Sequence, residues 1–169
     1  MAFFGDPARA LLLLVLANSL PWLIGRIGQR YAMALDFGLV LPDGRRMLGS
    51  HKTWRGVVSA ACGCALAAPL LGLHWWTGAA FAAVSLCGDA LSSLCKRRLA
   101  VAPGTAVLLL DQLPEALLPL IALRASLGLD PAAIAAVATT FTLLDVLASA
   151  IRRDNVPRAS LRGLRNPRG

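Results

Sequence analysis

The sequence predicts an all-α integral membrane protein with five transmembrane helices, and three observations indicate this class. The chain has 169 residues, of which 57% are hydrophobic. Only 15% are charged, whereas soluble domains have a share nearer a quarter. The charges are also segregated, because five apolar runs of membrane-spanning length contain no Lys or Arg. The residues outside these runs are too few to form a separate soluble domain.

The five apolar runs define the expected helices in order. They cover residues 10–25, 56–73, 77–95, 105–123 and 131–151. Residues 1–153 are therefore expected to form a single five-helix membrane domain, with cytoplasmic loops at about 26–55 and 96–104. Residues 154–169 are expected to form a basic cytoplasmic tail.

The distribution of basic residues predicts the orientation. Residues 26–55 contain six Lys or Arg, the turn at 96–98 contains three, and residues 152–168 contain six more. The opposite helix ends carry only Arg9 and Arg124. Because cytoplasmic loops of membrane proteins are enriched in Lys and Arg, we expect the N-terminus outside and the C-terminus in the cytoplasm. The expected location is the cytoplasmic (inner) membrane, which the chain crosses several times.

Four acidic residues lie inside the predicted spans, where an ionised carboxylate costs about 2.5–3.5 kcal/mol on insertion scales. They are Asp89, Asp111, Glu115 and Asp145. At 1.5 Å per residue, the three aspartates lie at one depth, about 9 Å from the expected cytoplasmic helix ends. Each acid could simply pair with a loop arginine. Carboxylates clustered at one depth, however, need a cation between them, and such oxygen ligands suit Mg²⁺.

The third predicted helix carries a polar stripe. Asp89, Ser92, Ser93 and Lys96 have the i, i+3, i+4, i+7 spacing of one helix face. The two serines could equally be small packing residues between membrane helices. The chain has only two lysines, Lys52 and Lys96, and both fall in the predicted cytoplasmic connections. A lysine ammonium is a good point charge for phosphate, so this arrangement above an Mg²⁺ site is typical of a polyphosphate site.

Four stretches resemble the archaeal CDP-archaeol synthases. These are "ANSLP" (17–21), "DGRRMLGSHKTWRG" (43–56), "GDALSSLCKRR" (88–98) and "LLDQL" (109–113). Members of that family are five-helix membrane cytidylyltransferases, similar in their catalytic half to CDP-diacylglycerol synthases. The resemblance covers residues 17–113, with the motifs in order.

The resemblance implies a reaction in which CTP and a phosphorylated membrane lipid give a CDP-lipid and pyrophosphate, with Mg²⁺ as cofactor. It implies no nucleic-acid partner and says nothing about the oligomeric state. Catalytic roles fall on Asp89, Asp111 and Lys96. Substrate-binding roles fall on Asn18, Lys52, Arg55, Ser92, Ser93 and Arg97, and the metal ligands are expected to be Asp89, Asp111 and Glu115.

The chain departs from the family pattern at two positions. His51 stands where the family usually has a small residue, and we assign it no role. Pro114 stands where the family pattern DQLD has its second acid. Glu115, brought round by a proline bend in the helix, supplies the missing carboxylate, or Asp145 does, or the site is altered.

Three other functions compete with this interpretation: phosphatidate cytidylyltransferase activity, a non-catalytic membrane protein derived from this fold, and a transporter. A transporter is disfavoured because its ionisable groups would be staggered in depth and its helices would often form inverted repeats.

Overall fold

The computed structural model is helical and describes residues 6–27, 33–44, 46–48, 52–101 and 108–154. A long helix is present at each of the five predicted positions. The helices are α1 (Asp6–Ile27), α2 (Trp54–Leu70), α3 (Trp75–Arg98), α4 (Leu108–Ala122), α5 (Arg124–Leu127) and α6 (Pro131–Asp154). The four-residue α5 was not predicted. The predicted tail at 154–169 lies almost wholly outside the described residues.

Three of the described helices are long and apolar enough to cross a membrane, namely α1, α3 and α6. Helix α2 is apolar but shorter. The protein is therefore a multi-pass helical membrane protein. The prediction of five crossings goes further than this finding.

Local sequence accounts for the helix ends. The Thr53 hydroxyl accepts a hydrogen bond from the Gly56 N–H (3.3 Å), which caps the start of α2. The Asp130 carboxylate accepts one from the Ala133 N–H (2.6 Å) at the start of α6. Helix α3 extends through Arg98 and not only to Cys95 as predicted, because basic side chains are favourable in the last turn of a helix.

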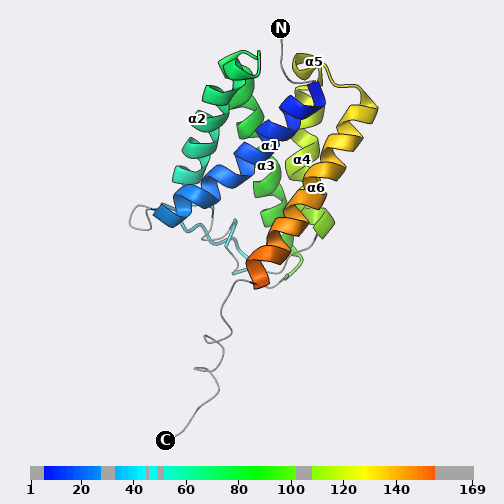
Figure 1. Ribbon diagram of the computed structural model, residues 1–169. Helices are drawn as coiled ribbons and strands as arrows, with labels where there is room; N and C mark the ends of the chain where they lie inside the picture. Colours follow the sequence, from blue (N-terminus) through cyan, green and yellow to red (C-terminus); the bar gives the residue numbers. More distant parts are fainter. Residues whose placement is uncertain (1–5, 28–32, 45, 49–51, 102–107, 155–169) are drawn as a thin grey trace, which may run out of the picture.

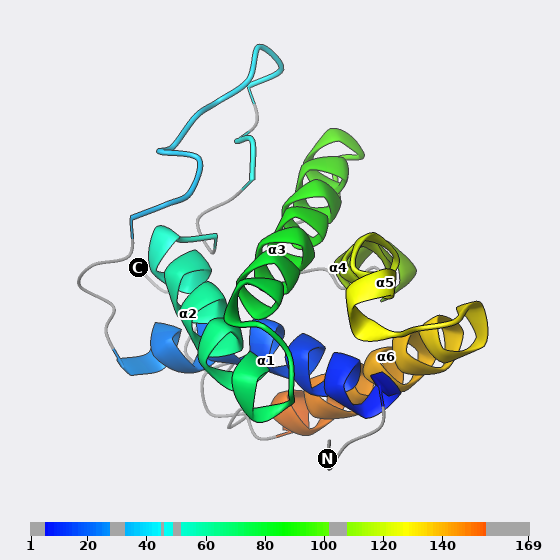
Figure 2. The same cartoon turned by 90° about the horizontal axis from the view of Figure 1, so that it is seen from above.

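Helix α3 lies centrally and packs against both α2 and α4, as Figures 1 and 2 show. Helices α1 and α6 cover one side of this group; they lie close together near the start of α1 and diverge toward its other end (Figure 1). The core between the helices contains Leu13 and Leu14 from α1, Phe81 from α3, Leu120 from α4 and Phe141 from α6.

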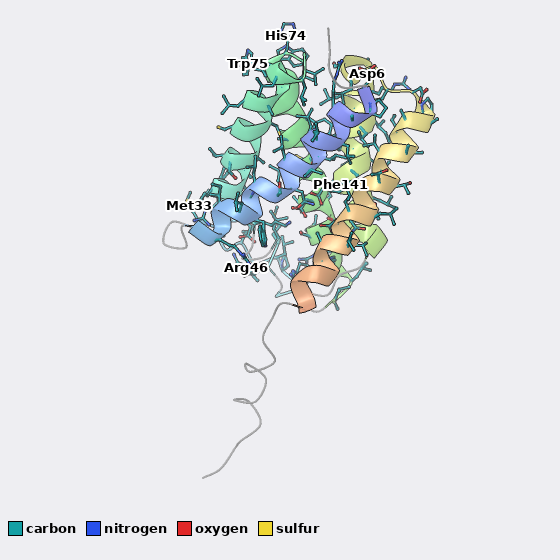
Figure 3. All side chains as sticks on the ribbon, in the orientation of Figure 1. Asp6, Met33, Arg46, His74, Trp75 and Phe141 are labelled. Carbon is teal, nitrogen blue, oxygen red and sulfur yellow. The ribbon has the colours of Figure 1, made fainter. Side chains whose placement is uncertain are left out.

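The labelled residues show which parts of the chain lie at each end of the bundle. Asp6, His74 and Trp75 lie at one end, while Met33 and Arg46, in the segment between α1 and α2, lie at the other (Figure 3). The last residues of α6 also lie at this second end (Figure 1). Because the described long helices are odd in number, the start of α1 and the end of α6 lie at opposite ends.

Two glycines of α3 let neighbouring helices touch backbone to backbone. A Cβ on Gly78 would lie 2.1 Å from the carbonyl oxygen of Cys64 in α2. A Cβ on Gly88 would lie 2.3 Å from the carbonyl oxygen of Pro114 in α4. Small residues serve this purpose in membrane helix packing. A Cβ on Gly63 of α2 would also approach within 2.1 Å, but of a Leu20 methyl group that can move aside.

These contacts predict different effects of one chemical change. Gly78→Ala and Gly88→Ala should each destabilise the protein by about 1–3 kcal/mol, because the added methyl group forces two backbones apart. Gly63→Ala is the matched control, since it meets only the end of a flexible side chain. Thermal unfolding in detergent, followed by circular dichroism, should show lower midpoints for the first two variants alone. Equal midpoints for all three would contradict the described packing.

Candidate active site

A cavity of about 240 Å³ lies between α1, α2, α3 and α4, near the end of the bundle where the 33–48 segment lies. Four of the residues that the sequence singled out line it. They are Asn18 from α1, Lys52 just before α2, Asp89 from α3 and Glu115 from α4. Side chains from positions 18 to 115 thus converge on one site, together with the apolar Pro21, Trp22 and Leu86.

Lys52 and Asp89 form an ion pair across the cavity wall. Their side chains are 27% and 26% exposed, so the pair is half-buried but still accessible from the cavity. The backbone around Lys52 is held by hydrogen bonds to residues near the start of the segment between α1 and α2. The Leu35 N–H donates to the Lys52 carbonyl (2.7 Å), and the Trp54 N–H donates to the Met33 carbonyl (3.1 Å).

Glu115 is buried at the point where α3 and α4 touch. The Ser85 hydroxyl donates a hydrogen bond to the Glu115 carbonyl (3.1 Å), which ties this turn of α4 to α3. Asp111 precedes Glu115 by one turn of α4, but its side chain lies outside the described residues. Two acidic residues of the described part, Asp89 and Glu115, therefore line the cavity.

Asp145 lies elsewhere. It lines a second cavity, between α1 and α6, and accepts a hydrogen bond from the Gln112 amide (2.9 Å). Of the two residues that could replace the missing family acid, the described structure brings Glu115 to the Lys52–Asp89 pair.

The rest of the polar stripe on α3 leads away from the cavity. The Ser92 hydroxyl is buried and donates to the carbonyls of Gly88 (3.2 Å) and Asp89 (3.0 Å) within its own helix. Neither Ser92 nor Ser93 lines the cavity. Lys96 and Arg97 lie in the last turn of α3, about 11–12 Å along the helix from Asp89.

Arg55 lies in the first turn of α2, close to Gly25 of α1. Its Nη1 atom is buried and has no hydrogen-bond partner among the residues that the structure describes. A buried guanidinium nitrogen without a partner is costly, and an anionic group is the partner that would satisfy it.

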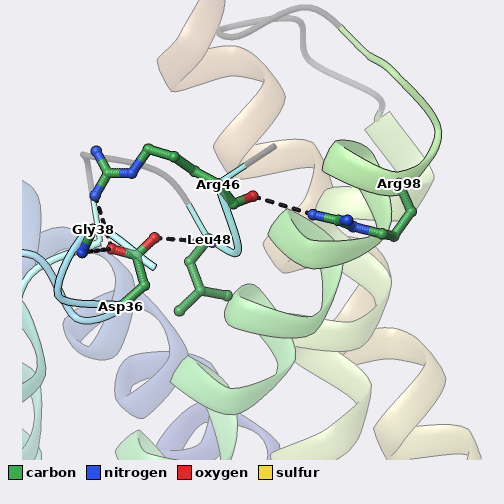
Figure 4. Close-up of polar contacts among 5 residues, drawn as sticks. All are labelled: Asp36, Gly38, Arg46, Leu48 and Arg98. Carbon is green, nitrogen blue, oxygen red and sulfur yellow. Dashed lines mark hydrogen bonds and ion pairs between the residues drawn. The ribbon is translucent and has the colours of Figure 1, made fainter. Parts of the chain in front are cut away.

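The segment between α1 and α2 has an internal anchor that the sequence analysis missed. The buried Asp36 carboxylate accepts hydrogen bonds from the N–H groups of Gly38 (3.0 Å) and Leu48 (3.1 Å) and pairs with the Arg46 guanidinium (2.8 Å), as Figure 4 shows. Arg98 at the end of α3 donates to the Arg46 carbonyl (3.3 Å). The one available signal was an aspartate two residues before a glycine, a common turn pattern.

Arg98 also pairs with Asp43, so α3 holds the loop at two points. The loop carries Lys52 at its far end, where an antiparallel bridge joins Ala34 and Thr53. The Ala34–Thr53 bridge, next to Lys52, helps to hold this residue beside Asp89.

The donor set of the cavity fits a hard divalent cation. Mg²⁺ is usually held by one or two carboxylates, with waters and substrate phosphates completing its shell. Asp89 and Glu115 supply two such carboxylates. The described residues contain no cluster of three His, Cys, Asp or Glu side chains, so no all-protein cage is present among them.

Comparison with known proteins finds similarity to one family of enzymes. A family model described as CarS-like, CDP-archaeol synthase, matches residues 11–75. A CDP-archaeol synthase of Aeropyrum pernix is 42% identical over 108 residues, covering 59% of this chain and 58% of the relative. The CDP-archaeol synthase of Thermofilum pendens is 33% identical over 118 residues, covering 64% of this chain and 58% of the relative.

A solved structure of an intramembrane enzyme for archaeal membrane lipid biosynthesis superposes with a TM-score of 0.70. It is 31% identical in sequence, and the match covers 84% of this chain and 91% of that one. The chain belongs to the CDP-archaeol synthase family. Its alignments to the curated family members span about three fifths of their length.

The Asp36 contacts in this CDP-archaeol synthase family member predict that a variant without them loses resistance to proteolysis. Asp36→Asn keeps the volume of the side chain but removes the charge that holds Arg46, at a cost of about 1.5–3 kcal/mol for a charged hydrogen bond. Trypsin should then cut within residues 33–48 at least ten times faster. Asp6→Asn, which removes an exposed acid at the opposite end of α1, is the control and should leave the cleavage rate unchanged. Equal rates for all three proteins would contradict the anchoring role.

Proposed function

We propose that the protein transfers a cytidylyl group from CTP to a phosphorylated membrane lipid, in a Mg²⁺-dependent reaction that yields a CDP-lipid and pyrophosphate. The observation that carries this proposal is the convergence of Asn18, Lys52, Asp89 and Glu115 on one cavity within a helical membrane bundle. The family membership supports the same reaction, because its curated members are named CDP-archaeol synthases.

The proposed reaction forms one bond and breaks one. A phosphate oxygen of the lipid attacks the α-phosphorus of CTP, and the bond from that phosphorus to the bridging oxygen breaks, so that pyrophosphate leaves with the electron pair. The attacking oxygen is already anionic, so no general base is needed. The protein's contribution is to align two anions and to neutralise their charge.

The residues of the site fit this task. Lys52 exchanges its pairing with Asp89 for a CTP phosphate, and Arg55 gains the anionic partner that its Nη1 atom lacks in the described part of the chain. Lys96 and Arg97, at the end of α3, attract the nucleotide to the mouth of the site.

Asp89 and Glu115 would hold Mg²⁺, together with Asp111 from the preceding turn of α4. When bound, the ion neutralises charge on the phosphates. Without it, two carboxylates beside an incoming triphosphate would repel the substrate. The Lys52 ammonium alone offsets only one of these charges.

We also propose five membrane crossings, with the N-terminus outside and the 33–48 segment on the cytoplasmic face of the inner membrane. The support is the concentration of Lys and Arg at the end of the bundle that carries Arg46, and their scarcity at the end that carries His74. This orientation gives the cavity access to cytoplasmic CTP.

Three acid variants test the reaction. Purified protein is supplied with Mg²⁺, CTP labelled at the α-phosphate, and acceptors with ether-linked or ester-linked chains. Wild type should transfer label to lipid and release pyrophosphate. Asp89→Asn and Glu115→Gln should lose at least 100-fold in rate, because each removes a ligand charge while preserving shape. Glu115→Gln should also raise the Mg²⁺ concentration needed for half-maximal rate.

Asp145→Asn is the matched control, because this acid lies in the other cavity; it should retain more than a third of the wild-type rate. A larger loss in Asp145→Asn than in Glu115→Gln would reverse the assignment of the third acid. Absence of lipid labelling by wild type with every acceptor would refute the proposed reaction.

The two ends of α3 test the orientation. This helix is about 36 Å long at 1.5 Å per residue, which exceeds the hydrocarbon thickness of about 30 Å. In a background without native cysteines, His74→Cys should react with a membrane-impermeant maleimide in intact cells. Leu99→Cys should react only after permeabilisation. Both side chains are exposed, so access is limited by the membrane alone. The opposite pattern would place the site away from CTP.

A further inference from the structure

The described part of the segment between α1 and α2 carries exposed apolar side chains, although it belongs to no helix. The exposed fractions are 56% for Met33, 72% for Phe37, 53% for Leu39 and 54% for Val40. We call these four side chains the Phe37 patch. Such a concentration of exposed apolar groups in a short segment is typical of a surface that contacts a partner or a membrane.

The backbone at Phe37 does not account for an aromatic residue at this position. Its φ is +48°, in the left-handed region that bulky residues rarely adopt and that Gly or Asn adopts with less strain. The turn is held by hydrogen bonds from the Phe37 N–H to the Ala34 carbonyl (3.1 Å) and from the Gly38 N–H to the Asp36 carboxylate (3.0 Å). The reason for a phenylalanine therefore lies in what its exposed ring contacts.

The ring of Phe37 lies beside the start of α2. Its centroid is 6.2 Å from that of Trp54, the first residue of α2, with the two planes at 45°. The Trp54 N–H also donates to the Met33 carbonyl (3.1 Å), and Figure 3 shows Met33 at this end of the bundle. The patch thus lies at the level where α2 begins.

Helix α2 presents a stripe of exposed side chains along its whole length, with a spacing of four residues that places them on one face. Its members are Trp54, Val58, Cys62, Leu66 and Leu70. Because this is an apolar helix of a multi-pass membrane protein, such an exposed apolar stripe faces the lipid. Phe37 contacts the first member of the stripe, so the Phe37 patch continues the lipid-facing surface of α2 beyond the helix.

The segment also projects sideways from the bundle. Figure 1 shows it near the level of the helix ends, and the view from above shows it extending beyond α2 and α3 (Figure 2). A segment in this position lies over the surrounding bilayer and not over the bundle itself.

We propose that the Phe37 patch lies in the interface of the surrounding bilayer, between the head groups and the acyl chains. Phenylalanine and leucine side chains of interfacial segments bury their apolar surface there, and tryptophan is enriched at the same level. The contact is independent of the proposed reaction. It also joins the bilayer surface to the wall of the active site, because Leu35, in the same segment, lines the cavity and its N–H bonds the Lys52 carbonyl.

Spin labelling of the full chain in phosphatidylcholine vesicles tests this contact. In the background without native cysteines, Leu39→Cys and Pro42→Cys each carry a nitroxide. Pro42 is the matched control, because it is exposed in the turn that the Asp43–Arg98 pair ties to the charged end of α3. Collision with oxygen, which concentrates in lipid, and with a nickel chelate, which stays in water, reports the depth of each label.

We expect the ratio of oxygen to nickel collisions to be at least threefold higher at position 39 than at position 42. Phe37→Asn should lower the ratio at position 39 to that at position 42, although Asn fits the left-handed backbone better. Phe37→Trp should preserve the difference, because it keeps an aromatic ring at the interface.

Equal ratios at the two positions, or a ratio at position 39 that Phe37→Asn leaves unchanged, would overturn the proposal. Exclusion of both reagents from position 39 would also overturn it, since a second copy of the chain would then cover the patch. The measurement needs neither CTP nor a lipid phosphate, so its outcome is separate from that of the cytidylyl transfer assay.

Discussion

The backbone contact between α3 and α4 at Gly88 is the constraint on which the site depends. No side chain separates Gly88 from the Pro114 carbonyl, so the next residue on each helix, Asp89 and Glu115, reaches the same cavity. The Ser85 hydroxyl holds the Glu115 carbonyl and fixes the rotation of α4 at this level. Two ionised acids at one cavity repel each other, and a cation between them offsets that repulsion. Lys52 supplies one positive charge through its pairing with Asp89.

That requirement gives a role to the contacts that the described residues before α2 make. A lysine at the end of a loose loop would lose side-chain and backbone entropy on pairing, and a surface pair contributes too little to offset that loss. Here the loop is already closed by the Asp36 carboxylate and attached to α3 through Arg98. The Ala34–Thr53 bridge and the hydrogen bond from the Leu35 N–H position Lys52, so its pairing with Asp89 costs little additional ordering.

The sequence predicted the five long helices because uncharged apolar runs of this length have few alternatives in a membrane chain. It also predicted that Lys52, Asn18 and Asp89 belong together, although only through their resemblance to a family. Depth along a helix was readable from residue counts, but rotation about the helix axis was not. Asp145 therefore appeared equivalent to Asp89, whereas the structure directs it to the cavity between α1 and α6. The Ser92 hydroxyl bonds carbonyls of its own helix, and its substrate-binding role stays a prediction. The Asp36 anchor depends on contacts between residues far apart in an irregular loop, which no periodicity reports.

The proposed reaction would bring together two substrates of opposite solubility. A nucleotide triphosphate loses much free energy when it leaves water, and a lipid chain loses free energy when it enters water. The proposed reaction therefore needs the reacting phosphorus at the boundary between the two media. Asn18 and Trp22 line both cavities, of which one also contains Lys52, Asp89 and Glu115 and the other is mostly apolar. In the proposed reaction, neither substrate then has to cross into the solvent of the other.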